Sequence, residues 1–368
     1  MRILVAPDSF GGSLTPLQAA QMMASGWLDA RPDDEVVLRP MSDGGEGLLD
    51  AVGAAIAGSA RPPVRRTCEV AGPLGLPLDA AWLLLEDGTA IIESALACGL
   101  ALVSPERRDP RMTTTWGVGQ LLEAAANAGA SRVLLGLGGS ATVDGGAGAL
   151  SALGWRITVA DGSGLKMGGE DLARVTSIAA GWVTPAVAAL SIELLADVTA
   201  SLGDAAATFG PQKGADHQTV EHLTHGLEVW ADVVETTFGA PGLRAHQGAG
   251  AAGGLGFALQ GAHGAALVVG ASRVASLVGL QEAVRDADLV LTGEGRFDAT
   301  SLTGKVVGTV AELAASAGTE VIAVCGQLDP AASTGTLREI VAVSPHGPPE
   351  HAGTVLREAV AALARQLP

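Results

Sequence analysis

Cysteine is scarce in this sequence, and its placement excludes two kinds of structural support. The three cysteines, Cys68, Cys98 and Cys325, are isolated and show no Cys-x-x-Cys spacing. An odd number of dispersed cysteines indicates neither a disulfide framework nor a zinc site. We therefore expect buried free thiols.

Long hydrophobic runs and an excess of positive charge are also missing. No segment approaches the ~18 apolar residues that span a bilayer, and the apolar run Ile3 to Ala6 is too short for a signal-peptide core. The formal net charge of −17 disfavours binding to nucleic acid or to anionic membranes. These absences predict a cytoplasmic protein whose partners are small molecules.

What is present is typical of a globular protein with two domains. The chain has 368 residues, of which 48% are hydrophobic and 17% charged, and a chain of this length usually builds more than one core. Arg2 to Ala6 reads as a strand, followed by a polar loop. A helix is predicted from Thr15 to Ala30, with Thr15 as N-cap and Pro16 at the first helical position.

Strands and helices then alternate along the chain. Further strands are predicted at residues 35–38, 80–85, 89–93, 132–137, 287–291 and 320–324, and helices at 48–57, 113–128 and 305–317. This alternation predicts an α/β fold with mainly parallel sheets covered on both faces. Ligands should gather at the carboxyl ends of the strands.

Four loops that follow apolar strands carry glycines and acids, at residues 7–13, 41–47, 138–148 and 292–298. Glycine lets the backbone approach a phosphate and turn its N–H groups toward it. The carboxylates could hold magnesium or accept a hydroxyl proton. They are Asp8, Asp43, Glu46, Asp144, Glu294 and Asp298. Any one of them could instead cap a turn or helix, but together they indicate a site for a magnesium nucleotide.

Standard nucleotide signatures do not account for these loops. The sequence has no Gly-x-x-x-x-Gly-Lys-Ser/Thr loop, and its one Gly-x-Gly-x-x-Gly match, at residues 248–253, does not follow a predicted strand. A nucleotide-dependent dehydrogenase, which would need that fingerprint, is therefore disfavoured.

Few basic side chains stand near these loops. Lys213 and Lys305, two of only three lysines, lie beside glycine and could meet a phosphate as point charges. Arg296 could clamp a substrate carboxylate or pair with its acidic neighbours. Glu221 and His225 have the spacing of a helical metal pair, but no third ligand is evident, so no metal site is predicted there.

Six motifs in order make the loops recognisable as a set. They are APDSFGGSLT (6–15), PMSDGGEG (40–47), GLGGSATVDGGAG (136–148), ADVT (196–199), FGPQKGA (209–215) and TGEGRFD (292–298). The chain resembles the glycerate kinase family. The resemblance implies a flavodoxin-like α/β domain built from residues 1–65 and 280–368, with a second α/β domain, 66–279, inserted. It also implies transfer of the γ-phosphoryl group of ATP to D-glycerate, giving 2-phosphoglycerate, with Mg²⁺ required.

We combine the motifs and the resemblance into a predicted site in the cleft between the domains. Asp8, Asp43 and Asp197 are the candidate catalytic residues, and Asp43 and Asp197 the candidate metal ligands. The predicted phosphate cradle comprises Gly138, Gly139, Ser140, Asp144, Gly145, Gly146 and Lys213. The predicted substrate-binding residues are Ser9, Glu46, Glu294, Arg296 and Asp298.

Three departures from the family pattern leave alternatives open. The chain has Gly11, Val143 and Ala200 where relatives commonly have a lysine and two asparagines. A kinase of another small hydroxy-acid, or a regulatory protein that binds ligand without turnover, would fit these losses. The oligomeric state is also open, with a homodimer as one option.

Overall fold

The computed structural model of the chain describes residues 1–58, 60–197, 199–343 and 349–367. The chain forms two compact units. Unit 1 comprises Met1–Pro62 and Val269–Pro368, and unit 2 comprises Pro63–Val268. Each has a hydrophobic core of its own. The domain boundaries predicted near residues 65 and 279 stay a prediction.

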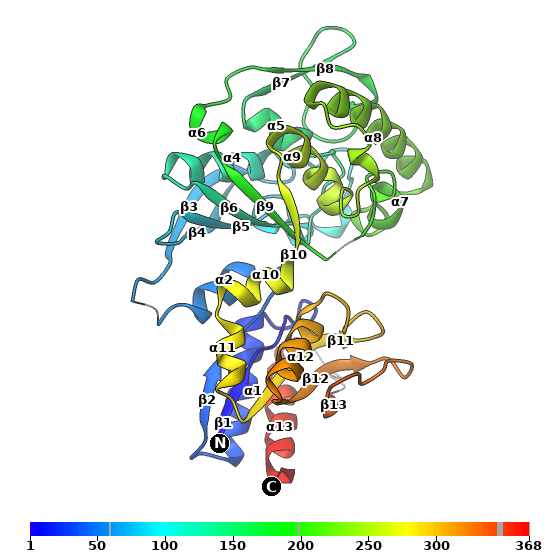
Figure 1. Ribbon diagram of the computed structural model, residues 1–368. Helices are drawn as coiled ribbons and strands as arrows, with labels where there is room; N and C mark the ends of the chain where they lie inside the picture. The colour runs from blue at the N-terminus through cyan, green and yellow to red at the C-terminus, as the bar shows by residue number, and fades with distance from the viewer. Residues whose placement is uncertain (59, 198, 344–348, 368) are drawn as a thin grey trace. The chain divides into compact units, whose positions relative to one another are not determined.

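Unit 1 is built on a five-stranded sheet in which both chain ends take part (Figure 1). All neighbouring strands are parallel. The strands in sheet order are β13 (Glu339–Ala342), β12 (Glu320–Leu328), β11 (Leu289–Phe297), β1 (Arg2–Val5) and β2 (Glu35–Leu38). Counted along unit 1, this is the order 2-1-3-4-5 of doubly wound sheets. The order reverses between β1 and β11, which creates a switch point at their carboxyl ends.

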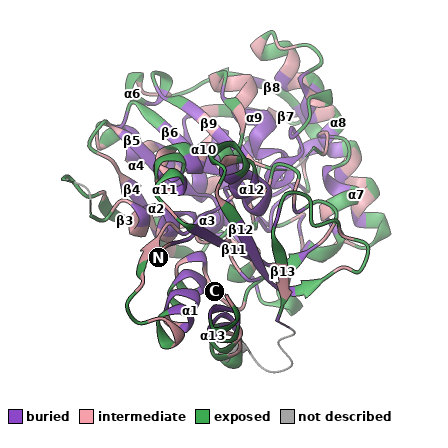
Figure 2. Cartoon of the chain, turned by 60° about the horizontal axis from the view of Figure 1, so that its bottom comes forward, coloured by how far each residue is buried: buried purple, intermediate pink, exposed green. Residues whose placement is uncertain are grey.

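Helices pack around this sheet in two groups. α1 (Pro16–Ala30) lies beside α13 (Pro349–Gln366), although they belong to opposite ends of the chain (Figure 1). α10, α11 and α12 pack against one another. Figure 2 shows β11 and β12 as buried strands and the exposed outer faces of α1 and α13. The bounds of the remaining helices are α2 (Leu48–Ala55), α10 (Gly270–Leu277), α11 (Leu280–Arg285) and α12 (Val306–Ala317).

Unit 2 contains a six-stranded mixed sheet. β3, β4 and β5 pair antiparallel, whereas β5, β6 and β9 pair parallel. The order is β10 (Ala266–Val269), β9 (Ser191–Ala196), β6 (Arg132–Gly136), β5 (Thr89–Glu93), β4 (Pro77–Leu84) and β3 (Val64–Ala71). A separate antiparallel pair joins β7 (Trp155–Val159) and β8 (Val175–Ala180). The predicted α/β class with mainly parallel sheets is confirmed.

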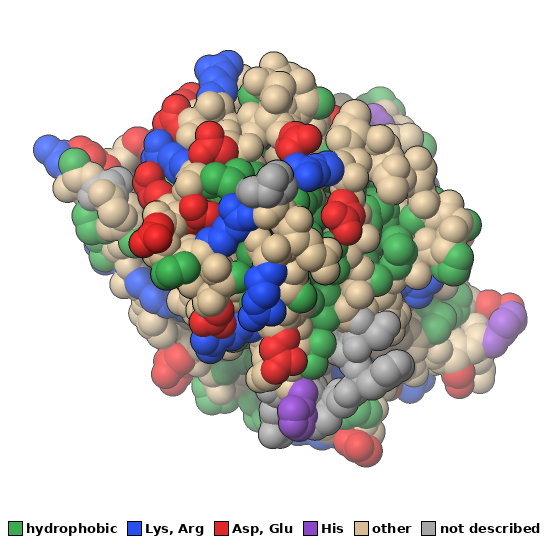
Figure 3. Space-filling view, turned by 90° about the horizontal axis from the view of Figure 1, so that it is seen from below, with side chains coloured by type: hydrophobic (Ala, Val, Ile, Leu, Met, Phe, Trp, Pro, Cys, Tyr) green, Lys and Arg blue, Asp and Glu red, His purple; other side chains and the backbone are tan. Residues whose placement is uncertain are grey.

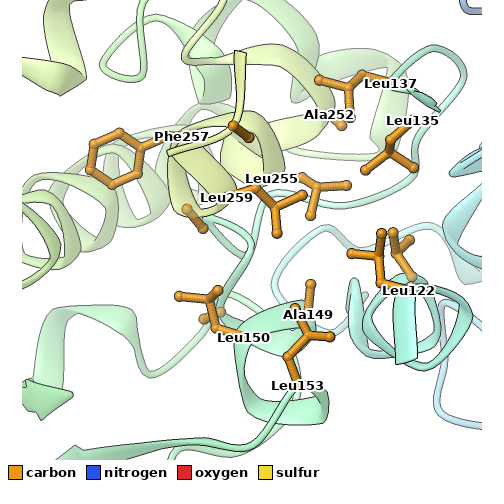
Figure 4. Packing of buried hydrophobic residues seen from close by; sticks show 14 of the residues in the cluster. Leu122, Leu135, Leu137, Ala149, Leu150, Leu153, Ala252, Leu255, Phe257 and Leu259 are labelled. Atoms are coloured by element: carbon orange, nitrogen blue, oxygen red, sulfur yellow. The ribbon is translucent and has the colours of Figure 1, made fainter. Parts of the chain in front are cut away.

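The core of unit 2 lies between this sheet and its helices. Leu122, Leu135, Leu150 and Leu255 come from different elements and point toward one another (Figure 4). The helices are α3 (Ala95–Cys98), α4 (Trp116–Asn127), α5 (Ala147–Ala152), α6 (Pro185–Ala188), α7 (Ala205–Phe209), α8 (His217–Phe238) and α9 (Leu255–His263). Short 3₁₀ turns span Leu100–Leu102, Pro105–Arg107, Leu172–Arg174, Pro211–Lys213, Leu243–Ala245 and Ala251–Gly254.

Local sequence signals placed several elements correctly. β2 and β5 have the predicted bounds, and Thr15 caps α1, with Pro16 as its first residue. The Thr15 side chain accepts from the N–H of Gln18, and the Gln18 side chain accepts from the N–H of Thr15. Cys98 and Cys325 are buried free thiols as expected, whereas Cys68 is half-buried.

One prediction about an element was wrong. The segment 292–298, predicted as a loop, belongs to β11 as far as Phe297. Gly293 and Gly295 allow this, because a side chain at either position would collide with Val324 of β12 or with the backbone of Phe10. The strand therefore carries its polar residues into the region beyond the carboxyl end of β1.

Among the described residues, no helix is both long and apolar enough to cross a membrane. Figure 3 shows acidic and basic side chains interspersed on the face seen from below. The net charge of −17 therefore does not produce a surface of one sign on that face.

Candidate active site

A pocket of about 430 Å³ lies in unit 1 at the switch point of its sheet. It is lined by residues that follow β1 and by the carboxyl-terminal parts of β11 and β12. Open α/β sheets bind ligands at this place, and the volume suits a small molecule. The polar lining residues include Asp8, Ser9, Ser13, Asp43, Glu294, Arg296, Lys305 and Gln327.

The loop after β1 is held against β11 by backbone contacts. The N–H of Asp8 donates to Gly293 O at 2.8 Å, and the N–H of Gly295 donates to Ser9 O at 3.2 Å. The carboxylate of Asp8 accepts from the N–H of Ser9 at 2.6 Å. These bonds hold Asp8 and Ser9 together in the pocket lining, and their predicted roles stay predictions.

Asp43 reaches the same pocket from the loop after β2. Its Oδ1 accepts from the N–H of Gly45 at 3.0 Å, which fixes the carboxylate within a tight turn. Gly270 is required beneath it, because a Cβ there would lie 1.7 Å from Asp43 O. The pocket thus joins carboxylates from two loops that are distant in sequence.

Glu294 is the buried acid of the pocket. It is 9% exposed, and its Oε1 has no hydrogen-bond partner among the described residues. Burial raises the pKa of Glu294 above its ordinary value, and the negative charges of Asp298 and Asp43 act in the same direction. A hydrogen bond from Ser301 and the positive charge of Lys305 oppose that rise.

Two cations line the pocket in different surroundings. Arg296 is 64% exposed and lies 3.9 Å from Asp298 and 3.8 Å from Asp329. Lys305 is half-buried at the N-cap of α12. Lys305 was recognisable in the sequence beside glycine, but its place in the site was not, because only the folded sheet brings the start of α12 to β11.

Two predicted substrate-binding residues do not belong to the lining of this pocket. Neither Glu46 nor Asp298 is among the described residues that line the pocket. Glu46 is exposed, and Asp298 accepts from the N–H and hydroxyl of Thr300 at 2.9 and 2.7 Å. Asp298 thus caps a turn, which was the alternative open for any single aspartate.

The glycine-rich loop after β6 in unit 2 is largely buried. Gly138 and Gly139 are accessible, but Gly145 and Gly146 are not. A Cβ at Gly145 would lie 2.5 Å from the Trp230 ring, and one at Gly146 would lie 2.6 Å from Ala258. These two glycines allow close packing, so the accessible part of the predicted cradle is its first turn.

Asp144 organises that loop from inside. The fully buried carboxylate accepts from the N–H and hydroxyl of Thr115 at 2.8 and 2.9 Å. It also accepts from the N–H groups of Gly146 and Gly148 at 3.1 and 3.3 Å. Burial raises its pKa, and these bonds oppose the rise. Asp144 therefore shapes the loop rather than presenting a free carboxylate.

Lys213 is buried beside the same loop. Its Nζ donates to Ser140 Oγ at 3.0 Å and to Thr142 O at 2.8 Å. Burial lowers the pKa of Lys213 to about 8, although the charges of Cys98 and Asp144 oppose this. In this arrangement the ammonium group ties down the loop, and its role toward a phosphate stays a prediction.

The remaining predicted catalytic residue, Asp197, follows β9 in unit 2 and is exposed. The three departures from the family pattern also have defined surroundings. Gly11 lines the unit 1 pocket, Val143 is fully buried in the core of unit 2, and Ala200 O accepts from the N–H of Gly250. Valine is well suited to the buried position 143, so this departure fits the packing.

The carboxylates in the pocket lining are of the kind that could serve as protein ligands for magnesium. Asp8 and Asp43 both line the pocket, and Mg²⁺ on a nucleotide usually needs one or two protein carboxylates, with phosphates and water as its other ligands. The described residues contain no group of three or more His, Cys, Asp or Glu placed to hold a metal by themselves.

Fold and pocket together define an α/β protein with a small polar ligand site at the switch point of a doubly wound sheet. The glycerate kinase family model matches residues 3–367. The chain belongs to the glycerate kinase family, which confirms the family and the enzyme class predicted from its motifs.

Relatives and a solved structure agree with this membership. The chain is 40% identical to the glycerate 2-kinase of Escherichia coli K12 over 332 residues, which cover 89% of this chain and 86% of the relative. It is also 40% identical to the glycerate kinase of Bacillus subtilis 168, with coverage of 89% and 85%. A crystal structure from Salmonella typhimurium LT2, assigned as glycerate kinase 2, matches with a TM-score of 0.83 and 36% identity, covering 100% of this chain and 98% of that one.

Proposed function

We propose that this protein transfers the γ-phosphoryl group of ATP to a hydroxyl of D-glycerate and releases 2-phosphoglycerate. The observation that carries the proposal is the similarity over 89% of the chain to a glycerate 2-kinase at 40% identity. A polar pocket of about 430 Å³, with carboxylates and two cations, supports it because a small hydroxy-acid needs both hydrogen-bond acceptors and positive charge.

In the proposed reaction, a bond forms between the substrate oxygen and Pγ while the bond from Pγ to the bridging oxygen of ADP breaks. The hydroxyl proton passes to a carboxylate, for which Asp43, Asp8 and Asp197 are the candidates. Such transfers depend mainly on positioning and on neutralising charge on the phosphates. Bound Mg²⁺ would supply part of that neutralisation, with Asp43 and Asp8 or Asp197 as its protein ligands.

The accessible turn Gly138–Gly139 is the proposed contact for ATP phosphates. Gly139 has a φ of +71°, a conformation in which glycine exposes its backbone N–H without steric cost. Ser140, Asp144, Gly145, Gly146 and Lys213 would support this turn from beneath, given their burial.

A coupled ADP-release assay with purified protein, Mg-ATP and D-glycerate tests the proposal, followed by identification of the product. We expect ADP release that requires D-glycerate and yields 2-phosphoglycerate. ADP release only with a different hydroxy-acid would identify that acid as the substrate instead of D-glycerate. ATP binding without release for any hydroxy-acid would favour a regulatory protein.

Replacing Asp197 by asparagine separates the candidate bases. If Asp197 accepts the proton or holds magnesium, Asp197→Asn abolishes turnover without unfolding the exposed site. Asp43→Asn serves as the parallel variant, with circular dichroism as the folding control. An active Asp197→Asn protein would remove that residue from the mechanism.

A further inference from the structure

The unit 1 pocket poses an electrostatic problem for the substrate class proposed above. Its lining includes the three acids Asp8, Asp43 and Glu294, and clustered negative charge repels a carboxylate. A hydroxy-acid can bind there only beside a cation. Among the residues that the structure describes, Arg296 and Lys305 are the cations in the lining, so the question is which of them meets the carboxylate.

Arg296 is exposed to solvent and already lies beside two acidic side chains. It is 64% exposed and lies within 4 Å of both Asp298 and Asp329. An exposed cation gains little from a further ion pair, because water screens it and its acidic neighbours already balance its charge. Arg296 is therefore poorly placed to supply most of the attraction.

Lys305 has the opposite surroundings. It is half-buried, and among the residues that the structure describes its Nζ makes no hydrogen bond and no ion pair within 4 Å. It lies at the N-cap of the 12-residue helix α12, whose first-turn N–H groups add partial positive charge. Lys305 is thus an available cation with reduced exposure to water.

Glu294 supplies an independent indication of a ligand-binding position. The residue is more than nine-tenths buried and lines the pocket, yet its Oε1 has no partner in the described part of the chain. Leaving a buried polar atom without a hydrogen bond is energetically costly, and such an atom in a native protein calls for an explanation such as a bound ligand, ion or water. A hydroxyl donor entering the pocket would satisfy it.

We propose that Lys305 and Glu294 together recognise the hydroxy-acid. Lys305 binds its carboxylate, and Glu294 Oε1 accepts a hydrogen bond from one of its hydroxyls. Both residues touch the same pocket, and the charge of Lys305 acts on Glu294. Arg296, the cation favoured by sequence, is then peripheral to carboxylate binding. This inference rests on the proposed function, since it names the groups that select its acceptor.

Calorimetric binding of D-glycerate and of glycerol, which lacks the carboxylate, tests the proposal without requiring turnover. We expect Lys305→Met to weaken D-glycerate binding about 10- to 100-fold, the range for a hydrogen bond to a charged group, and to leave glycerol binding within about twofold. Lys305→Arg should recover part of the loss. Arg296→Met, the matched control, should change D-glycerate binding less than about threefold.

Glu294→Met tests the hydroxyl contact, because it removes the accepting oxygen that a glutamine would keep. Propionate keeps the carboxylate and lacks hydroxyls, so this variant should weaken D-glycerate binding relative to propionate binding, since a change of charge at position 294 affects both anions alike. The proposal is overturned if Lys305→Met binds D-glycerate as the wild type does, or if Arg296→Met takes the larger loss. Failure of the proposed function would show separately, as wild-type protein that binds D-glycerate but releases no ADP.

Discussion

Lys213 shows how burial changes the behaviour of a single charged residue. Its ammonium group is enclosed in unit 2 and bonded to Ser140 and Thr142 O. Burial disfavours the charged form of an amine, and the pKa of Lys213 is lowered from 10.5 to about 8. The protonated lysine therefore lowers the stability of the folded state at neutral pH.

This shift predicts a pH dependence with a definite sign. Between pH 8 and 10.5 the unfolded chain binds more protons at Lys213 than the folded chain does, so the free energy of unfolding should rise with pH in that window. The full shift corresponds to about 3 kcal/mol. Urea unfolding of the wild type and of Lys213→Met across this pH range measures the effect. The free energy of unfolding of the wild type should rise with pH relative to that of the variant.

Lys166→Met provides the control for that measurement, because Lys166 is exposed. Its stability should run parallel to that of the wild type through the same pH window. A Lys213→Met curve that also runs parallel to the wild type would contradict the assigned pKa shift.

Gly11 permits a second prediction at the scale of one residue. It lines the unit 1 pocket, has a φ of +49°, and a Cβ there would meet nothing within 4 Å. Gly11→Lys should cost about 1–2 kcal/mol of stability, because left-handed backbone disfavours side chains. It should also lower the KM for an anionic substrate, measured by ADP release, by adding positive charge to the pocket.

Gly12→Lys is the matched control, since Gly12 also has a positive φ of +76° and open space around it but is not in the described pocket lining. It should lose similar stability and keep the wild-type KM. Equal kinetic effects of the two variants would mean that the added charge acts at long range rather than in the pocket.

At the scale of elements, α1 begins at a reciprocal cap. Thr15 and Gln18 each satisfy a backbone N–H of the other, and Pro16 begins the helix. Together these interactions fix the start of a helix that packs against α13. The cap thus supports a contact between the two ends of the chain.

Thr15→Ala should therefore lower the free energy of unfolding by about 1 kcal/mol, the usual cost of losing an N-cap hydroxyl. Urea denaturation of the variant and of Thr15→Ser, which keeps the hydroxyl, measures the effect. Equal losses in the two variants would assign the cost to packing of the threonine methyl group instead of to the cap.

At the scale of the whole molecule, the chain divides its core between two units. The buried cluster of unit 2 draws all its residues from 70–265, and that of unit 1 draws its residues from 3–27 and 289–364. β1, from the amino-terminal segment, occupies an interior position between β2 and β11. Unit 1 therefore needs both chain ends, whereas unit 2 is continuous.

This division predicts that residues 63–268 fold when expressed alone, while residues 269–368 do not. The first fragment keeps its sheet and core, and the second loses β1 and β2 from its sheet. Thermal melting by circular dichroism should show a cooperative transition for the first fragment only. A non-cooperative melt of residues 63–268 would mean that unit 2 depends on unit 1 for stability.

Local features of the sequence were sufficient to identify several elements and the family. Apolar periodicity, Thr15 with Pro16, and the placement of glycine loops after strands are local features, so they identified β2, β5, α1 and the α/β class without knowledge of distant contacts. Six ordered motifs were enough for the glycerate kinase family because several independent matches rarely occur together by chance.

The accessibility of the polar residues, in contrast, depended on the three-dimensional fold. Burial depends on what other segments cover, and so Asp144 and Lys213 are enclosed in unit 2 although their motifs read as open loops. For the same reason Lys305, distant in sequence from Asp8, joins it in one pocket, whereas Glu46 does not. Residue type specifies the chemistry available, but long-range packing determines where that chemistry can meet a ligand.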